Sequence, residues 1–169
     1  MDKKYSEACI SCRPVDKAEA DRTILTTEHC RVVLRIDDQA WLGRCIILPK
    51  RHVNSFEQLT REEHDDIYAC RAKVCEVYKK LFGMTYDNWA QLGNLTRDHE
   101  GKETDDARYS HIHYHLIPRY RKPAVWNNQE FTDVQFGKPL NIDPNAGHKK
   151  LVMTHETLLE LQKTIAQSI

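Results

Sequence analysis

Apolar and polar positions along the chain predict several short strands. Residues 31–36 (Arg-Val-Val-Leu-Arg-Ile) and 45–48 (Cys-Ile-Ile-Leu) are β-branched, apolar runs separated by a polar break, which is typical of two neighbouring strands. Residues 85–93 are rich in aromatic side chains and predict a further strand. Residues 109–117 alternate strictly and stop at Pro118, so they predict a strand with one buried face.

Two later patterns are helical. A threonine at Thr60 is followed three residues later by Glu63, which is the capping-box signature of a helix start. Apolar side chains then recur at spacings of three and four as far as Leu81, and Gly83 follows where a helix end favours glycine. A final helix is expected to begin near Thr154. We therefore predict an α+β domain: a mostly antiparallel sheet, one long helix packed on it, and a C-terminal helix.

The other segments carry weaker signals. Residues 94–108 are polar and dense in charge, which predicts a long loop or an insertion. Prolines and glycines recur across residues 121–150, so little regular structure is expected there. The chain has 169 residues and no visible repeat or linker. We expect a single domain over residues 1–169, with a core at about 9–120 and a C-terminal extension at 121–169.

Composition narrows the class of protein. The chain has 25 basic and 25 acidic residues, so a broad basic face for a nucleic-acid polymer is not expected. No apolar run approaches the roughly 20 residues of a membrane span, and no signal peptide is visible. We expect a cytoplasmic protein without a membrane partner. The unusual feature is 9 histidines beside 6 cysteines, which in a reducing compartment favours metal binding or catalysis.

Three of the histidines are spaced by two residues in the predicted strand 109–117. They are His111, His113 and His115. Alternate side chains of a strand share a face, so the three imidazoles are expected on one face and the apolar residues between them on the other. The spacing alone leaves three interpretations open: a solvated strand face, ligands of a catalytic metal, or a nucleophilic histidine.

Two cysteines form a Cys-x-x-Cys pair near the N-terminus. Cys9 and Cys12 could chelate one Zn²⁺, and two more nitrogen or sulfur donors would complete a tetrahedral site. A mobile tail with two free thiols is the simpler alternative. A redox pair is a third, although no thioredoxin-like βαβ pattern surrounds it.

The histidine run resembles the signature of a known family. His-Ile-His-Tyr-His-Leu-Ile at 111–117 resembles the His-φ-His-φ-His-φ-φ motif of the histidine triad (HIT) family, where φ is apolar. Pro-Lys-Arg-His-Val at 49–53 resembles a second segment of that family. Leu-Gly-Arg at 42–44 and the N-terminal cysteine pair resemble one of its subgroups. The resemblance covers about residues 9–120.

Membership in this family would imply a HIT-like fold and a nucleotide-binding enzyme. Such enzymes cleave a nucleotide at its α-phosphate through a covalent nucleotidyl-histidine. By resemblance, His113 would be the nucleophile and His115 would bind phosphate oxygens, with no metal needed for the chemical step. The expected substrate is a nucleoside 5′-phosphate derivative such as a dinucleoside polyphosphate. Alternatives are a nucleoside phosphoramidate or adenylyl sulfate, transfer of the nucleotidyl group, and a regulatory module that only binds nucleotides.

The resemblance further implies a structural zinc ion and a homodimer. In relatives that have the N-terminal cysteine pair, two histidines complete the zinc site, and they correspond to His52 and His111 here. The expected ligands are therefore Cys9, Cys12, His52 and His111. Dimers are common in the family, so a homodimer is expected by resemblance only.

Several polar residues resemble substrate ligands of the family. An acidic residue after the strand at 31–36 holds the ribose hydroxyls there; Asp37 is our candidate, with Asp38 as the alternative, although such a pair is also typical of a solvated turn. Arg44 stands where many relatives have histidine, and it could bind phosphate or be an exposed strand residue. Two further phosphate-binding candidates are Asn94 and Ser110. The glutamine that many relatives have before the triad is missing.

Overall fold

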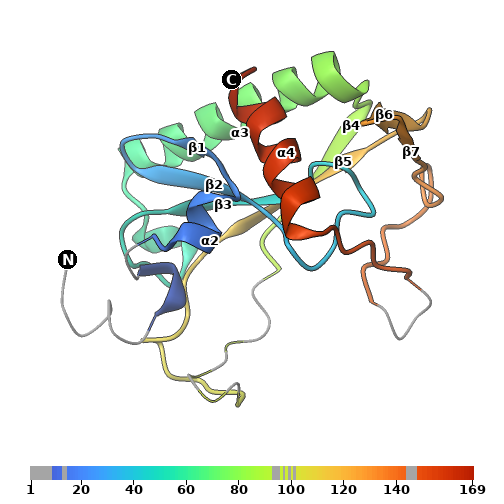
Figure 1. Ribbon diagram of the computed structural model, residues 1–169. Helices are drawn as coiled ribbons and strands as arrows, with labels where there is room; N and C mark the ends of the chain where they lie inside the picture. The colour runs from blue at the N-terminus through green and yellow to red at the C-terminus, as the bar shows by residue number, and fades with distance from the viewer. Residues whose placement is uncertain are drawn as a thin grey trace.

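A five-stranded antiparallel sheet forms the centre of the computed structural model, with the strand order β1-β2-β3-β5-β4 (Figure 1). The structure describes residues 9–12, 15–92, 96, 98, 100, 102–143 and 148–169. The sheet strands are β1 (Thr23–Thr26), β2 (Cys30–Leu34), β3 (Cys45–Pro49), β4 (Tyr86–Ala90) and β5 (Tyr114–Arg119). Short helical turns are η1 (Ile10–Cys12), α2 (Lys17–Ala20) and η2 (Phe56–Gln58).

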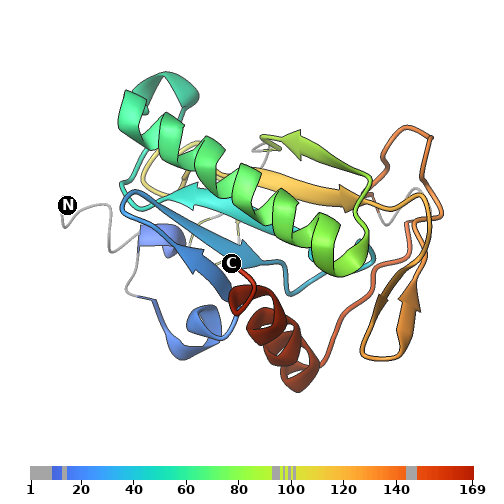
Figure 2. The ribbon, with the colours of Figure 1, turned by 90° about the horizontal axis from the view of Figure 1, so that it is seen from above.

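The long helix α3 (Arg61–Phe82) lies across one face of the sheet (Figure 2). It begins with the predicted capping box: the Thr60 side chain accepts from the Glu63 amide, and the Glu63 carboxylate accepts from the Thr60 amide. Gly83 ends it in a left-handed conformation at φ 68°, which glycine adopts without steric cost. The sequence prediction for this helix is confirmed.

The C-terminal helix α4 (His155–Ala166) completes the core. Thr154 caps it by accepting from the Thr157 amide, as the sequence predicts. The helix contacts β1 and α3. Its buried side chains are Leu158, Leu161 and Ile165. The α+β fold is therefore confirmed, and no helix among the described residues is long and apolar enough to cross a bilayer.

The two faces of the sheet have different partners. Cys45 and Ile47 of β3 belong to the core cluster beneath α3. The intervening Ile46 points to the opposite face, because successive strand residues alternate. Ile46 is paired directly with Val33 of β2 and with His115 of β5, and directly opposed residues share a face. A histidine of the triad thus lies in one row with two aliphatic side chains, on the face away from α3.

The predicted strand at 109–117 needs a correction at both ends. Strand β5 begins at Tyr114 and runs through Pro118 to Arg119. The segment before it makes one backbone hydrogen bond to the residues after β3, from the Ile112 amide to the Val53 carbonyl at 2.8 Å. Pairing with β3 ends at Leu116, while β4 pairs with β5 as far as Arg119, so Pro118 has a strand neighbour on one side only, where proline is tolerated.

The expectation of little regular structure in residues 121–150 is wrong in one place. Strands β6 (Ala124–Trp126) and β7 (Gln129–Phe131) form a hairpin. Its two-residue turn holds Asn127 and Asn128 at φ 49° and φ 58°. Positive φ at both turn residues is typical of type I′ hairpins, for which asparagine is favoured. The Asn-Asn pair was therefore a usable signal in the sequence.

Candidate functional site

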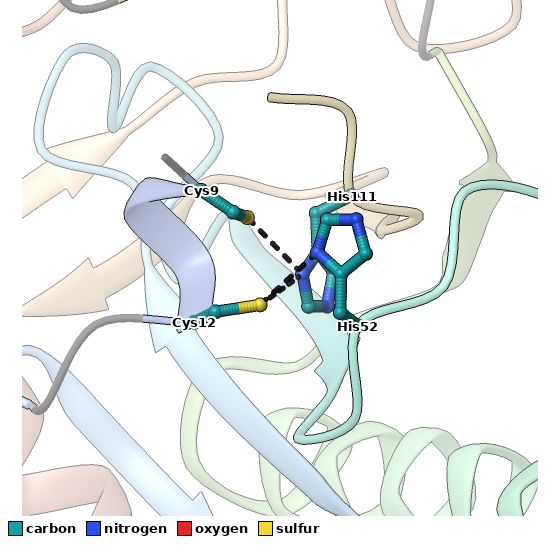
Figure 3. Close-up of side chains that lie close together, drawn as sticks. All are labelled: Cys9, Cys12, His52 and His111. Atoms are coloured by element: carbon teal, nitrogen blue, oxygen red, sulfur yellow. Dashed lines mark hydrogen bonds between the residues drawn. The ribbon is translucent and has the colours of Figure 1, made fainter. Parts of the chain in front are cut away.

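Four side chains from three parts of the chain meet beside the end of β3. Cys9 and Cys12 come from the N-terminal segment, His52 follows β3 and His111 precedes β5 (Figure 3). The Sγ atom of Cys12 lies 3.2 Å from Nδ1 of His52, and Sγ of Cys9 lies 3.4 Å from Nδ1 of His111. Tetrahedral zinc with bonds of about 2.3 Å to sulfur and 2.0 Å to nitrogen separates such ligands by roughly 3.5 Å. The donors and their spacing fit zinc.

Backbone carbonyls orient both histidines of this cluster. His111 donates from Nε2 to the Pro49 carbonyl at 2.9 Å, and His52 donates from Nε2 to the Ala107 carbonyl at 3.2 Å. A carbonyl can only accept, so both neutral rings carry their proton on Nε2. The lone pairs on Nδ1 therefore face the thiols. Metal-ligating histidines are commonly oriented in this way.

The two thiols are buried, and their pKa values are shifted in opposite directions, so that Cys9 is the one ionised. Hydrogen bonding with Cys12 lowers the pKa of the Cys9 thiol to about 3. Hydrogen bonding with Cys9 and burial raise the pKa of the Cys12 thiol. Thiolate is the form of cysteine that binds metals, and coordination would deprotonate the second thiol as well.

The other two triad histidines lie next to this cluster. His113 donates from Nδ1 to the His111 carbonyl at 3.0 Å, which leaves Nε2 as an unprotonated nitrogen in the neutral ring. The ring centroids of His113 and His115 are 5.0 Å apart. Burial lowers the pKa of His113 below its usual value, and burial with the neighbouring His113 lowers that of His115 to about 3. Both rings are therefore neutral near pH 7, as a nitrogen nucleophile requires.

A small cavity of about 150 Å³ lies on the sheet face that carries His115. Its apolar part is formed by Val33, Ile46 and Leu48, of which Ile46 is paired with His115. Ser11, Glu19 and Arg22 complete its lining. An apolar surface edged by a few polar groups is typical of small-molecule sites.

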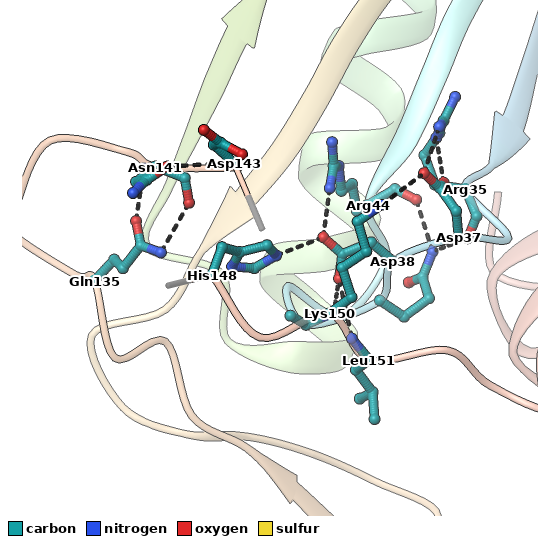
Figure 4. A network of polar contacts seen from close by, with 12 residues as sticks. Arg35, Asp37, Asp38, Arg44, Gln135, Asn141, Asp143, His148, Lys150 and Leu151 are labelled. Carbon is teal, nitrogen blue, oxygen red and sulfur yellow. Dashed lines mark hydrogen bonds and ion pairs between the residues drawn. The ribbon is translucent and has the colours of Figure 1, made fainter. Parts of the chain in front are cut away.

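The two acidic candidates after β2 have different environments. The Asp38 carboxylate is fully buried and accepts from Arg44 Nη1 at 2.6 Å and from His148 Nε2 at 2.7 Å (Figure 4). Asp37 is partly exposed and binds Arg35 through two hydrogen bonds of 2.7 Å. Partial burial opposes its charge, but Arg35 holds the pKa of Asp37 below the usual value. Of the two, Asp37 is the one available to a ligand.

The remaining candidate ligands differ in how the structure places them. Arg44 is 5% exposed, so the alternative of an exposed strand residue is excluded. Arg44 lies two residues before Ile46, the strand partner of His115, and its carbonyl accepts from the Arg35 amide at 2.9 Å. The charges of both guanidinium groups contribute to lowering the pKa of His115. Ser110 is half-buried, and its carbonyl accepts from Asn54 Nδ2 at 3.4 Å. Asn94 lies outside the described residues.

Sequence reasoning missed two residues of this region. Arg35 follows Val33 by two positions, so strand alternation would have placed it on the face of the triad. His148 has no local signal, because its partner Asp38 is 110 positions away in the sequence.

The chain is similar to members of one known family. The HIT domain matches residues 17–122. An uncharacterised HIT-like protein of Methanocaldococcus jannaschii is 27% identical over 135 residues, which are 80% of this chain and 92% of that protein. A diadenosine triphosphate hydrolase of Plasmodium falciparum, solved with Cyclomarin A, has a TM-score of 0.56 at 17% identity and covers 90% of this chain and 77% of its own. A Zn-bound histidine triad family protein of Mycobacterium smegmatis has a TM-score of 0.52 at 17% identity, and the match covers 86% of this chain and 84% of that protein. The structural likenesses show a shared fold.

Proposed function

Because the chain belongs to the histidine triad family, we propose that it is a nucleotide-binding hydrolase that cleaves its substrate at the α-phosphate. The observation that carries this proposal is the hydrogen bond from His113 Nδ1 to the His111 carbonyl. It fixes the tautomer in which Nε2 is unprotonated, while burial keeps the ring neutral. A nucleophile needs both conditions.

In the proposed reaction, His113 Nε2 attacks the α-phosphorus of the nucleotide. A nitrogen–phosphorus bond forms, and the bond from phosphorus to the oxygen of the leaving phosphate breaks, so that oxygen keeps the electron pair. Water then attacks the same phosphorus and loses a proton to solvent, while the nitrogen–phosphorus bond breaks and returns its electron pair to Nε2, which restores the neutral histidine. The products are a nucleoside monophosphate and the leaving phosphate compound. His115 would donate a hydrogen bond to the phosphate oxygens as charge develops on them.

For the substrate we propose a dinucleoside polyphosphate. The cavity at Ile46, the strand partner of His115, offers an aliphatic surface to a base, and Asp37 offers a carboxylate to the ribose hydroxyls. Arg35 and Arg44 add positive charge near the phosphates. The Plasmodium protein that shares this fold is a diadenosine triphosphate hydrolase by its name, which supports this choice.

The test is a panel of diadenosine tetraphosphate, diadenosine triphosphate, adenosine phosphoramidate and adenylyl sulfate. We expect fastest cleavage of a diadenosine polyphosphate, with oxygen from isotope-labelled water recovered in adenosine monophosphate. A faster reaction with the phosphoramidate or adenylyl sulfate would favour those alternatives. Incorporation of added inorganic phosphate into adenosine diphosphate would indicate a transferase. Binding of adenosine monophosphate without cleavage of any compound would favour the regulatory module.

A structural zinc ion at Cys9, Cys12, His52 and His111 is the second part of the proposal. Its support is the convergence of the four donors within 4.8 Å and the carbonyl bonds that turn both Nδ1 atoms toward the thiols. The Mycobacterium protein with the same fold is described as Zn-bound. Zinc here would crosslink the N-terminal segment to the residues that flank β3 and β5.

Replacement of Asp37 by alanine is expected to raise KM for a ribonucleotide substrate by roughly tenfold or more, since a hydrogen bond to a charged group contributes about 1.5–3 kcal/mol. The matched control is the same substrate without its 2′- and 3′-hydroxyls. On that substrate, Asp37→Ala and the parent are expected to have similar KM values, because Asp37 has no hydroxyl to bind. An equal loss on both substrates would show that Asp37 does not read the ribose.

A further inference from the structure

Residues 148–151 lie against the connection between β2 and β3 (Figure 4). The backbone amide of Gln39 donates to the Leu151 carbonyl at 2.7 Å, and the backbone amide of Leu151 donates to Asp38 Oδ1 at 3.2 Å. His148 Nε2 donates to Asp38 Oδ2 at 2.7 Å. Residues distant in sequence from the triad motif therefore hold the turn that carries Asp37.

Asp38 is the centre of these contacts. Its Oδ2 atom accepts from Arg44 and His148, and its Oδ1 atom accepts from the Ala40 and Leu151 amides. Four donors occupy the four acceptor positions of one carboxylate. Because the group is fully buried, water cannot replace a lost donor without a change in packing.

The His148 ring is held on a second side as well. It stacks on Trp41 at 4.6 Å between ring centroids and 11° between planes. Trp41 Nε1 donates to Asp133 Oδ1 at 3.2 Å, and Asp133 is paired with Arg119 of β5 at 2.6 Å. The imidazole therefore has one orientation, with its Nε2–H directed at Asp38.

This network reaches the candidate site through the ends of two strands. Gln39 Nε2 donates to the Arg35 carbonyl at 2.7 Å and to the Arg44 carbonyl at 2.8 Å. Arg35 binds Asp37, and the Arg44 side chain binds Asp38. The positions of Arg35, Asp37 and Arg44 thus depend on the connection between β2 and β3.

We propose that His148 is a positioning residue: through Asp38 it fixes the Arg44 side chain and the Asp37 turn relative to His115. The inference rests on the proposed function, because it assigns Arg44 and Asp37 to phosphate and ribose. According to this proposal, residues 148–151, which precede α4, hold the proposed nucleotide-binding residues in place. His148 itself touches no substrate in this arrangement.

The test compares His148→Ala with His148→Gln, whose amide N–H can replace the imidazole donor. His155→Ala is the matched control, because His155 is an exposed histidine of the same region that pairs with Asp21 at 3.3 Å. We expect His148→Ala to raise KM for diadenosine tetraphosphate about tenfold with little change in kcat. His148→Gln should stay within about threefold of the parent, and His155→Ala should match it.

Hydrogen exchange supplies a readout that does not depend on activity. His148→Ala should speed exchange of the backbone amides of Gln39, which donates to the Leu151 carbonyl, and of Gly43, which donates to Gln39 Oε1, but not of the amides of α3. Unchanged exchange at these amides would overturn the inference. So would a fall in kcat, at unchanged KM, that is proportional to the loss of folded protein. A parent protein that cleaves none of the panel would overturn the proposed function instead, and exchange would still decide whether His148 holds the turn.

Discussion

Replacement of His113 by alanine is expected to lower kcat for diadenosine tetraphosphate by about 10³-fold or more. The loss follows from the chemistry, since Nε2 of this ring is the atom that would bond to phosphorus. The fold should persist, because the one hydrogen bond lost is to the His111 carbonyl. Release of adenosine monophosphate, followed by chromatography, measures the rate. His155→Ala is the control, as an exposed histidine far from the triad in sequence.

The covalent intermediate supplies a second measurement on the same variant. Parent protein mixed with substrate labelled at the α-phosphorus and quenched in alkali should retain label on histidine. The His113→Ala protein should retain none, because no nitrogen–phosphorus bond can form there. Equal labelling of both proteins, or an unchanged cleavage rate, would assign the nucleophile to another residue.

Loss of zinc is expected to produce the largest change in stability. The parent should contain about one zinc per chain, and its removal by a chelator should lower the free energy of unfolding by roughly 3 kcal/mol or more. Cys12→Ser should cause a similar loss, because Cys12 lies within 3.4 Å of the Nδ1 atoms of both His52 and His111. Metal analysis and chemical denaturation, with and without chelator, measure the two effects.

A thiol outside the cluster provides the matched control for this prediction. Cys75 is buried on α3, so Cys75→Ser should keep the full zinc content whatever it does to packing. Far less than one equivalent of zinc in the parent, purified without chelators, would contradict the site. The same conclusion would follow if Cys12→Ser bound as much zinc as the parent.

Local patterns in the sequence predict the elements that local physics determines. Helix α3 was predictable with both ends, because the capping box at Thr60 and the glycine at Gly83 act within a few residues. Helix α4 was predictable from Thr154 for the same reason. The start of β5 was not, because alternation continues through His111 and His113 while the backbone there makes a single bond to the residues after β3.

The candidate site was likewise predictable only where local motifs determine it. The motifs indicated the four donors of the cysteine–histidine cluster, and the structure brings their donor atoms within 4.8 Å. Which acidic residue is available could not be predicted, because burial of Asp38 depends on His148, and that contact spans 110 positions. Contacts between distant segments depend on tertiary packing, which no local periodicity records.

His111 couples two processes through two different atoms. Its ring belongs to the zinc cluster and is anchored to the Pro49 carbonyl, while its own carbonyl selects the tautomer of His113. A substitution of the His111 side chain keeps that carbonyl but removes the ring that anchors it, so we expect the carbonyl to move away from His113 and the proposed turnover to fall. In a mutational scan scored by activity alone, His111 and His113 would be indistinguishable. Scoring protein abundance in parallel would separate them, since only the His111 variants should also be lost from the folded pool.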